Sequence, residues 1–310
     1  IDCIPTWLDS RFGNTLQSTE VIEILLPKFL TEGADNTEKA ERIIEHITRV
    51  RVEESSKQSS QEVEGSTREA EESTPEIIKA IIDSPKEQEK KSLLADIYTL
   101  REFFEENYQL LAEKCTLKVV KILADRVRNL VSSEYDETLY SFYDYEKQSH
   151  LLNHPLELLP YAIMKIMVEK ARKEPEGLKP ILKEFLKERT LLFPKLALFV
   201  IAHNMKDLGD LLWEFIRSED GAKLFENTQY WGDELKKALE KLGSLTDEQK
   251  EILMQRIEEG VVNRIRGLKD GQKRRLEAML KQGIYQALSH NREFKKLYEK
   301  MKKVTNKDVE

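Results

Sequence analysis

Two histidines have the spacing of a metal site. His150 and His154 lie four residues apart, which would let two imidazoles on one helix face share a zinc ion. Pro155 follows them, however, and the residue before a proline is disfavoured in helical geometry. We therefore expect Asn153 or His154 to cap a helix that begins at Pro155, and we expect no metal at this pair.

Other residues with catalytic potential lack their usual context. Asp83, Glu89 and Lys91 are spaced like the carboxylates and lysine of metal-dependent nucleases, but those residues need a strand hairpin and this stretch is expected to be helical. His203 has no carboxylate or nucleophile patterned beside it, so we interpret it as a hydrogen-bonded residue at a helix end. The chain has no glycine-rich phosphate loop, dinucleotide fingerprint or nucleophile elbow. The sequence therefore predicts a non-enzymatic protein with no catalytic residues and no cofactor.

Aromatic side chains are concentrated between residues 135 and 145, in a polar context. Tyrosines give a large contact area at a small cost in side-chain entropy, so they are candidates for binding a partner. The candidates are Tyr135, Tyr140, Tyr143 and Tyr145. The alternative is that the rings pack a loop onto the body of the domain. Neighbouring carboxylates would repel phosphate, which disfavours stacking with nucleic-acid bases.

The C-terminal region is basic, whereas the chain as a whole is acidic. Residues 260–310 contain 14 Lys and Arg against 6 Asp and Glu, which leaves a net charge of −15 for the other residues of a chain with net charge −7. The cations that would contact a phosphate backbone are Arg264, Arg266, Arg274, Arg275, Lys296, Lys300 and Lys303. Glu277 and Glu299 indicate that part of this charge belongs to ordinary pairs within helices. The alternatives to nucleic acid are a solvated helix face and docking onto the acidic part of a partner subunit.

Composition favours helices with short connections. The chain of 310 residues is 35% charged and 40% hydrophobic and contains only 12 glycines and 9 prolines. Cys3 and Cys115 lie far apart, so no disulfide framework is indicated and a cytoplasmic location is expected. No secretory signal is visible at the start of the sequence.

The most apolar stretch, residues 189–216, is expected to form a central helix pair. Pro194 lies in the first turn of its first helix, and Asn204 can end that helix. The apolar run between Lys195 and His203 is much shorter than the roughly 20 residues that a membrane span requires, so no membrane contact is expected. The second helix has five apolar positions at helical spacing, namely Leu208, Leu211, Leu212, Phe215 and Ile216.

Similar pairs recur every 35 to 45 residues. This pattern predicts an all-α fold, a right-handed array of antiparallel helix pairs that forms a HEAT-like α-solenoid. We expect three segments: an N-terminal helix pair at 1–52, an acidic Ser/Glu-rich linker or loop at 53–74, and the helical array with its basic C-terminal helices at 75–310.

Three local predictions concern helix ends. A long helix is expected to begin at Ser84 and Pro85 and to keep its apolar face from Leu93 to about Lys114. Thr246 and Gln249 form a capping-box pattern. The helix that they start is expected to bury Leu253, Met254 and Ile257 and to end at Gly260, and a later helix is expected to use Met279 on its apolar face.

Four stretches between residues 191 and 260 carry a resemblance to a known family. They are LLFPKLALFVIAHN, LWEFI, LFENTQYWGDELKKAL and LGSLTDEQKEILMQRIEEG. In this order they resemble a module of the C-terminal helical-repeat regions of large bacterial STAND-type NTPases. The resemblance implies that the array senses a foreign protein in antiviral defence, while ATPase and effector modules lie elsewhere in a longer chain.

These patterns predict a helical-repeat module that recognises a protein, either a separate partner or other domains of the same longer chain. The alternative is a nucleic-acid-binding helical protein that uses residues 264–303.

Overall fold

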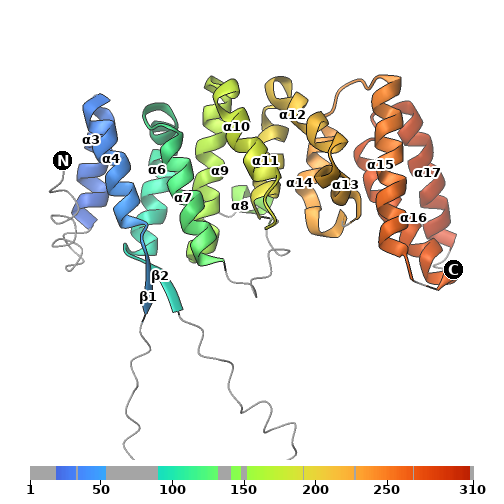
Figure 1. Cartoon of the computed structure of the whole chain (residues 1–310), viewed down its shortest axis with the longest axis horizontal. Helices are drawn as coiled ribbons and strands as arrows, with labels where there is room; N and C mark the ends of the chain where they lie inside the picture. The colour runs from blue at the N-terminus through green and yellow to red at the C-terminus, as the bar shows by residue number, and fades with distance from the viewer. Residues whose placement is uncertain are drawn as a thin grey trace, which may run out of the picture.

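The computed structural model describes residues 19–32, 34–53, 90–131, 141–147, 152–190, 192–226, 228–267 and 269–307. Helices make up 83% of these residues, which confirms the prediction of a mostly helical protein. Figure 1 shows the helices side by side in a row from the N-terminal to the C-terminal end. Within the described ranges, no helix combines the length and the apolar composition needed to cross a bilayer.

The elements follow one another with short connections in most of the chain. The N-terminal half contains the π-helical turn η1 (Val21–Leu25), α3 (Leu26–Thr31), α4 (Ala34–Ile47), β1 (Val50–Glu53), β2 (Lys90–Leu93), α6 (Ile97–Lys114), α7 (Leu117–Leu130) and α8 (Phe142–Lys147). Next come α9 (Pro155–Lys173), α10 (Pro175–Leu186), α11 (Leu192–His203) and α12 (Met205–Arg217). The C-terminal part contains α13 (Glu219–Glu226), α14 (Thr228–Glu240), α15 (Asp247–Ile265), α16 (Asp270–Ala287) and α17 (Arg292–Lys307).

The helices pack in two layers. In the first layer α3 contacts α6, α6 contacts α9, α9 contacts α11, α11 contacts α14, and α14 contacts α16. In the second layer α4 contacts α7, α10 contacts α12, and α12 contacts α13 and α15. Contacts between the layers, such as α7 with α9 and α16 with α17, close a single hydrophobic core that runs from η1 to α17.

The central helix pair lies where the sequence predicts it. Helix α11 is buried from Leu192 to Ala202, Pro194 occupies its first turn, and Asn204 separates it from α12. All five apolar positions predicted for the second helix are buried in α12. Because α11 contacts helices of both layers, it must be apolar on every side, whereas α12 is apolar on one side only.

Helix ends agree with the predicted caps. The side chain of Thr246 accepts a hydrogen bond from the Gln249 amide at 3.2 Å and the Gln249 side chain accepts one from the Thr246 amide at 3.0 Å. His154 caps α9, since its Nδ1 accepts a hydrogen bond from the Leu156 amide at 3.2 Å. That side chain therefore completes a helix end, as its position before Pro155 indicates.

Two short strands correct the all-α prediction. β1 pairs antiparallel with β2, with Val50 opposite Leu93 and Glu53 opposite Lys90. The helix expected to run through Leu93 instead begins at Ile97, because Asp96 accepts hydrogen bonds from the amides of residues 98 and 99 and fixes the helix start there. Figure 1 shows the strand pair projecting from the row between α4 and α6.

The three predicted segments can be compared with the packing on either side of the strand pair. Residues 54–74 of the expected linker lie outside the described residues. On either side of them, α3 packs against α6 and α4 packs against α7, so the N-terminal helix pair shares its core with the helices that follow.

The expected end of α15 is wrong. Gly260 lies inside the helix, which continues to Ile265. A Cβ atom at Gly260 would lie 2.4 Å from the carbonyl carbon of Phe225, so the glycine serves a close approach of α13 and α15 and not a helix end. Two methionines expected in the core are also exposed, Met254 by 39% and Met279 by 52%.

Candidate protein-binding surface

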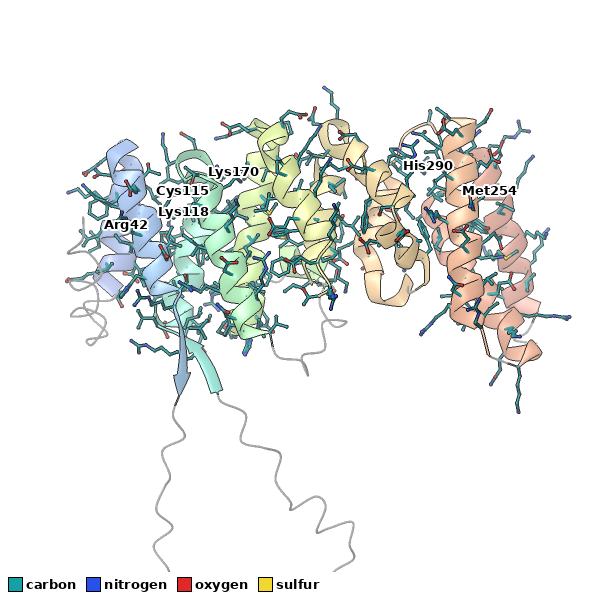
Figure 2. All side chains as sticks on the ribbon, in the orientation of Figure 1. Arg42, Cys115, Lys118, Lys170, Met254 and His290 are labelled. Atoms are coloured by element: carbon teal, nitrogen blue, oxygen red, sulfur yellow. The ribbon has the colours of Figure 1, made fainter. Side chains whose placement is uncertain are left out.

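A groove of about 620 Å³ runs along α15 at the C-terminal end of the row, beside the first turn of α17. Figure 2 labels Met254, an exposed side chain of α15 that lines it. The lining side chains are Asp247, Lys250, Glu251, Met254, Gln255, Glu258 and Glu293. Four of them are carboxylates, so the groove combines an exposed thioether with an acidic rim.

The packing of α15 determines which of its side chains reach the groove. Leu253, Ile257 and Val261 are buried and recur every four residues, so their stripe faces the core. Gly260, on the same side, holds α15 against the backbone of α13. The outward stripe that remains consists of Asp247, Glu251, Met254, Glu258 and Val262.

One end of the groove is held by Lys250. Its Nζ atom lies 2.7 Å from a carboxylate oxygen of Asp247 and 3.6 Å from one of Glu293, so it joins α15 to α17. The hydrogen bond with Asp247 raises the pKa of Lys250 and lowers the pKa of Asp247. Glu251 has no ion-pair partner among the residues described, which leaves its carboxylate available to a cation from outside.

The inner side of the groove rests on α16. Lys281 is buried and donates hydrogen bonds to Glu258 at 2.5 Å and to Glu277 at 2.7 Å. Burial acts to lower the pKa of Lys281, but these two hydrogen bonds raise it. Burial raises the pKa of the neighbouring Tyr285 to about 12. These residues remain in fixed charge states at neutral pH and hold Glu258 in place.

Two of the predicted cations border the groove on α17. Lys296 and Lys300 follow Glu293 by three and seven residues, so they lie on the same helix face one and two turns further on. Both are exposed and, in the part of the chain that is described, neither has an ion-pair partner. We call Lys296 and Lys300 the basic ridge; Val304, 40% exposed, continues its face.

The remaining predicted cations gather at the far end of the same three helices. Arg264 and Arg266 end α15, Arg274 lies near the start of α16, and Lys303 lies near the end of α17, all with exposed side chains. Arg275 belongs to α16, but its side chain is outside the description. The structure thus separates the predicted set into the basic ridge beside the groove and a basic end.

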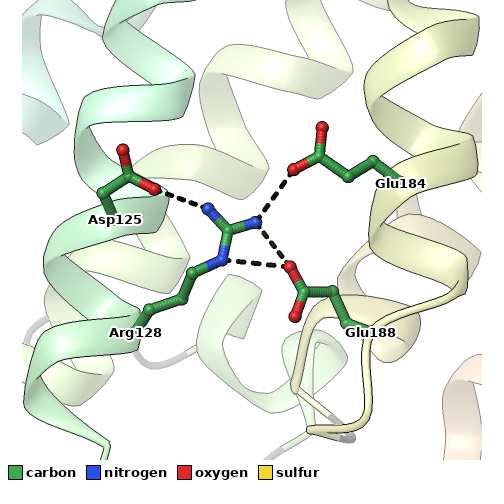
Figure 3. Close-up of polar contacts among 4 residues, drawn as sticks. All are labelled: Asp125, Arg128, Glu184 and Glu188. Carbon is green, nitrogen blue, oxygen red and sulfur yellow. Dashed lines mark hydrogen bonds and ion pairs between the residues drawn. The ribbon is translucent and has the colours of Figure 1, made fainter.

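Elsewhere in the second layer, cations between helices are neutralised. Figure 3 shows Arg128 of α7, which lies within ion-pair distance of Asp125, of Glu184 in α10 and of Glu188 just beyond α10. Its guanidinium carbon also lies 4.9 Å from the centre of the Phe193 ring. Arg128 therefore joins α7 to α10 through charge and through a cation–π contact.

Among the described residues, the ion pairs that join one part of this layer to the next have one direction. In each, the cation belongs to the earlier helix and the carboxylate to the later part of the chain. They are Arg128 with Glu184 and Glu188, Lys179 with Asp210 (2.9 Å), Lys183 with Glu214 (2.7 Å), Arg217 with Glu248 (3.5 Å) and Lys250 with Glu293 (3.6 Å). The basic ridge lies on α17, beyond the last of these pairs.

One of the four predicted tyrosines has a described side chain. Tyr143 in α8 lies 4.6 Å from Phe199 and 5.8 Å from His203, measured between ring centres, so it packs α8 onto α11. His203 ends α11 and its Nδ1 lies 2.9 Å from the Phe199 carbonyl oxygen, as interpreted from the sequence. The candidates Tyr135 and Tyr140 lie outside the described residues, as does the side chain of Tyr145.

A carboxylate is buried where α8 meets α14. Glu234 is fully buried and accepts a hydrogen bond from the Phe142 amide at 2.7 Å. Burial raises the pKa of Glu234 to about 6, although the Phe142 amide and the charge of Lys195 act in the opposite direction. Lys195 in α11 is only 2% exposed. The centre of the row therefore holds opposite charges within its core.

Polar contacts also join α4, α7 and α9. Glu41 accepts hydrogen bonds from the amide and the hydroxyl of Thr116 at 2.7 and 2.8 Å, and Lys170 donates to the Cys115 carbonyl at 2.6 Å. Figure 2 labels Cys115 and Lys170 at this junction. Burial raises the pKa of the Cys115 thiol to about 12, which keeps it protonated and structural.

The remaining candidates for chemistry are not assembled into a site. In the described ranges no group of three or more His, Cys, Asp or Glu side chains is placed to hold a metal. His150, Asp83 and Glu89 lie outside these ranges. Lys91 lies in β2, so the helix expected there is wrong.

Sequence reasoning did not identify the groove. Its acidic stripe has helical spacing in the sequence, with Asp247, Glu251 and Glu258 at i, i+4 and i+11. Met254 interrupts this acidic pattern in the sequence. Because it is apolar and lies close to Leu253 and Ile257, the sequence predicts that it is buried in the core. The contribution of Glu293 requires knowing that α17 returns beside α15.

Comparison of the chain with protein-family models, with curated proteins and with solved structures finds no match in any of the three.

Proposed function

We propose that this chain is a protein-recognition module, a HEAT-like α-solenoid of right-handed antiparallel helix pairs that binds another protein through the surface of α15 and α17. The ion pairs between second-layer helices support a repeating design, because three of them join residues 31 positions apart. A repeating array of helices presents an extended surface on which partner contacts can be placed without altering the core.

One observation carries the proposal: an exposed apolar side chain lies inside an acidic groove and beside a basic ridge. Met254 lines a hollow of about 620 Å³, where a methionine can adapt to an incoming side chain. Glu251 on one side, and Lys296 and Lys300 on the other, have no partner within the described residues. An apolar centre with charged groups around it is the usual composition of a protein interface.

Nucleic acid is the second candidate ligand, and the basic end favours it. Arg264, Arg266, Arg274 and Lys303 are exposed at one end of three helices. Phosphate would benefit from these cations through counterion release. The carboxylates of the groove, including Glu251 and Glu293, would repel the same backbone, and this contrast is why we place a protein first.

The resemblance of residues 191–260 to the helical-repeat regions of STAND-type NTPases adds a biological setting. If it holds, the α15 and α17 surface belongs to the sensor part of a larger defence protein. The full-length gene product tests this directly, since an upstream phosphate loop and ATPase module are required by that assignment.

A peptide-display selection against the whole chain tests the proposed function. We expect selected peptides to bind the wild type, to lose binding to a Met254→Asp variant and to keep binding to Ile24→Asp, which changes a more exposed apolar residue at the other end of the row. If no selected peptide depends on Met254, the proposed surface is wrong. Binding of a double-stranded oligonucleotide that depends on Arg264 and Arg274 would instead support the second candidate.

A further inference from the structure

We propose that the partner of this surface is a second copy of the chain, which docks with its own α15 and α17 in a two-fold symmetric dimer. The inference rests on the proposed function, because it names the protein that the groove and the basic ridge bind. It is argued from the charges of these two helices, their relative direction and their exposed apolar side chains.

Helices α15 and α17 both pack against α16 and run in the same direction. Lys250 in the first turn of α15 pairs with Glu293 in the first turn of α17. Further along α15, Glu258 is joined to α16 through Lys281, and further along α17, Thr305 is joined to α16 through Gln282 at 2.9 Å. The surface therefore consists of an acidic stripe on one helix beside a parallel basic stripe on the next.

Such a surface is complementary to itself. In a two-fold interface the same patch of both copies meets, so that residue i of one contacts residue j of the other and the reverse contact forms as well. The two-fold axis lies between the two helices and runs parallel to them. A rotation of 180° about it places the basic ridge of each copy over the acidic groove of its partner. Because Lys250 and Glu293 lie at the same level, Lys296 then meets the unpaired Glu251, and Lys300 lies at the level of Gln255 and Glu258, once on each side of the axis.

The apolar side chains on the two stripes strengthen this assignment. Met254 is 39% exposed, Val262 on α15 is 54% exposed and Val304 on α17 is 40% exposed. They lie on the same outward stripes as the unpaired charges, so docking of a second copy removes them from water together. A polyanion such as nucleic acid would cover the lysines but would leave Met254 and Val262 in contact with its phosphates.

The directional ion pairs of the second layer give a precedent within the chain. Five times, a cation of one helix pairs with a carboxylate of another helix, from Arg128 with Glu184 through to Lys250 with Glu293. The acidic groove of a second copy would supply carboxylates to the basic ridge in the same way.

A charge-exchange experiment on the whole chain tests the dimer. The groove variant carries Glu251→Lys and Gln255→Lys, and the ridge variant carries Lys296→Glu and Lys300→Glu. Within the described ranges none of the four side chains takes part in an ion pair, and Gln255 donates a hydrogen bond to Glu259 on its own helix, so the fold is expected to be retained. Circular dichroism and thermal unfolding check this for each variant.

Analytical ultracentrifugation then measures association. We expect the wild type to dimerise at low salt and to dissociate as sodium chloride increases. Each variant alone places like charges opposite one another, so its dissociation constant should rise at least about tenfold. An equal mixture of the two variants should recover the dimer, because each interface of the mixed dimer again joins opposite charges. The matched control, Lys121→Glu on the exposed surface of α7, should dimerise like the wild type.

Specific outcomes overturn the inference. A wild type that stays monomeric at low salt, or a mixture that does not recover association, rules out this dimer. If peptides selected on the wild type still depend on Met254 in that case, the proposed function stands and only the second copy is wrong. If neither self-association nor Met254-dependent binding is found, both proposals fail.

Discussion

The charged side chains at the centre of the helical row differ from those on the groove and the basic ridge at its C-terminal end. At the centre, Lys195 and Glu234 lie inside the core. At the C-terminal end, Glu251, Lys296 and Lys300 remain in water with no partner among the described residues. Burying opposite charges is costly and serves the fold only when each charge is compensated, whereas exposed unpaired charges cost little and add little stability. The contrast agrees with our proposal that the C-terminal end serves association.

Phe199→Asp should test the centre most severely. The Phe199 ring is 1% exposed and lies 4.1 Å from His203 and 4.6 Å from Tyr143, between ring centres. Removing a buried phenyl ring and adding an uncompensated carboxylate should lower the free energy of unfolding by more than about 5 kcal/mol. Val262→Asp, at a half-exposed site on α15, is the matched change at the end. Urea unfolding followed by circular dichroism should show a large loss for the first variant and little for the second; a stable Phe199→Asp protein would contradict the comparison.

Gly260→Ala should test whether α13 and α15 pack as closely as the structure shows. The added Cβ would overlap the backbone of Phe225, which cannot rotate away, so a loss of about 3 kcal/mol is expected as α13 and α15 separate. Gly177→Ala in α10 meets nothing within 4 Å and should stabilise the protein by about 0.5–1 kcal/mol. Opposite shifts of the thermal midpoint are the expected result. Equal shifts would mean that α13 and α15 do not approach this closely.

Glu234→Gln should change how the free energy of unfolding depends on pH. The carboxyl has a pKa of about 6 in the folded protein, above its ordinary value of 4.5, because burial disfavours its charged form. Between pH 4.5 and pH 6 this carboxyl binds more protons in the folded state than in the unfolded state. The free energy of unfolding therefore increases as the pH falls through 6 and decreases as the pH rises through 6. Between pH 7 and pH 5 the wild type should gain about 1 kcal/mol relative to the variant. Parallel pH dependences of the two proteins would argue against a perturbed carboxyl.

Lys183→Ala should have the smallest effect. Its Nζ lies 2.7 Å from Glu214 in α12, on the exposed surface of the layer. Such pairs contribute less than about 1 kcal/mol, and less at high salt. Lys300→Ala, which breaks no ion pair with any residue that the structure describes, should leave the free energy of unfolding unchanged. Urea titrations at 50 mM and 500 mM salt measure both; the difference between the variants should shrink at the higher salt.

The elements of the centre could be predicted because local signals agree there. Pro194, Asn204 and the five apolar positions of α12 each fix a boundary or a face without reference to distant residues. The caps at Thr246 and His154 are likewise local. Where periodicity and capping coincide, the sequence alone specifies the helix.

The strands and the groove could not be predicted, since both depend on residues that are distant in the sequence. Val50 continues the apolar period of α4 and reads as helical, and its pairing with Leu93 spans a long intervening segment. Met254 looks buried until the position of α17 is known. Gly260 resembles a helix end unless the approach of Phe225 is taken into account.

Because of the strand pair, the chain between Glu53 and Lys90 could be shortened or replaced without changing the order of the helices. These two residues are register partners, so both ends of the segment that joins them lie at one ladder spacing, roughly 5 Å apart. A tight turn can close that distance, and so can a folded domain whose termini are adjacent. The helices on either side would keep their packing in each case. The strand pair is therefore a natural insertion point, where the length and content of the chain can change during evolution, or be replaced by a reporter, while the helical row is preserved.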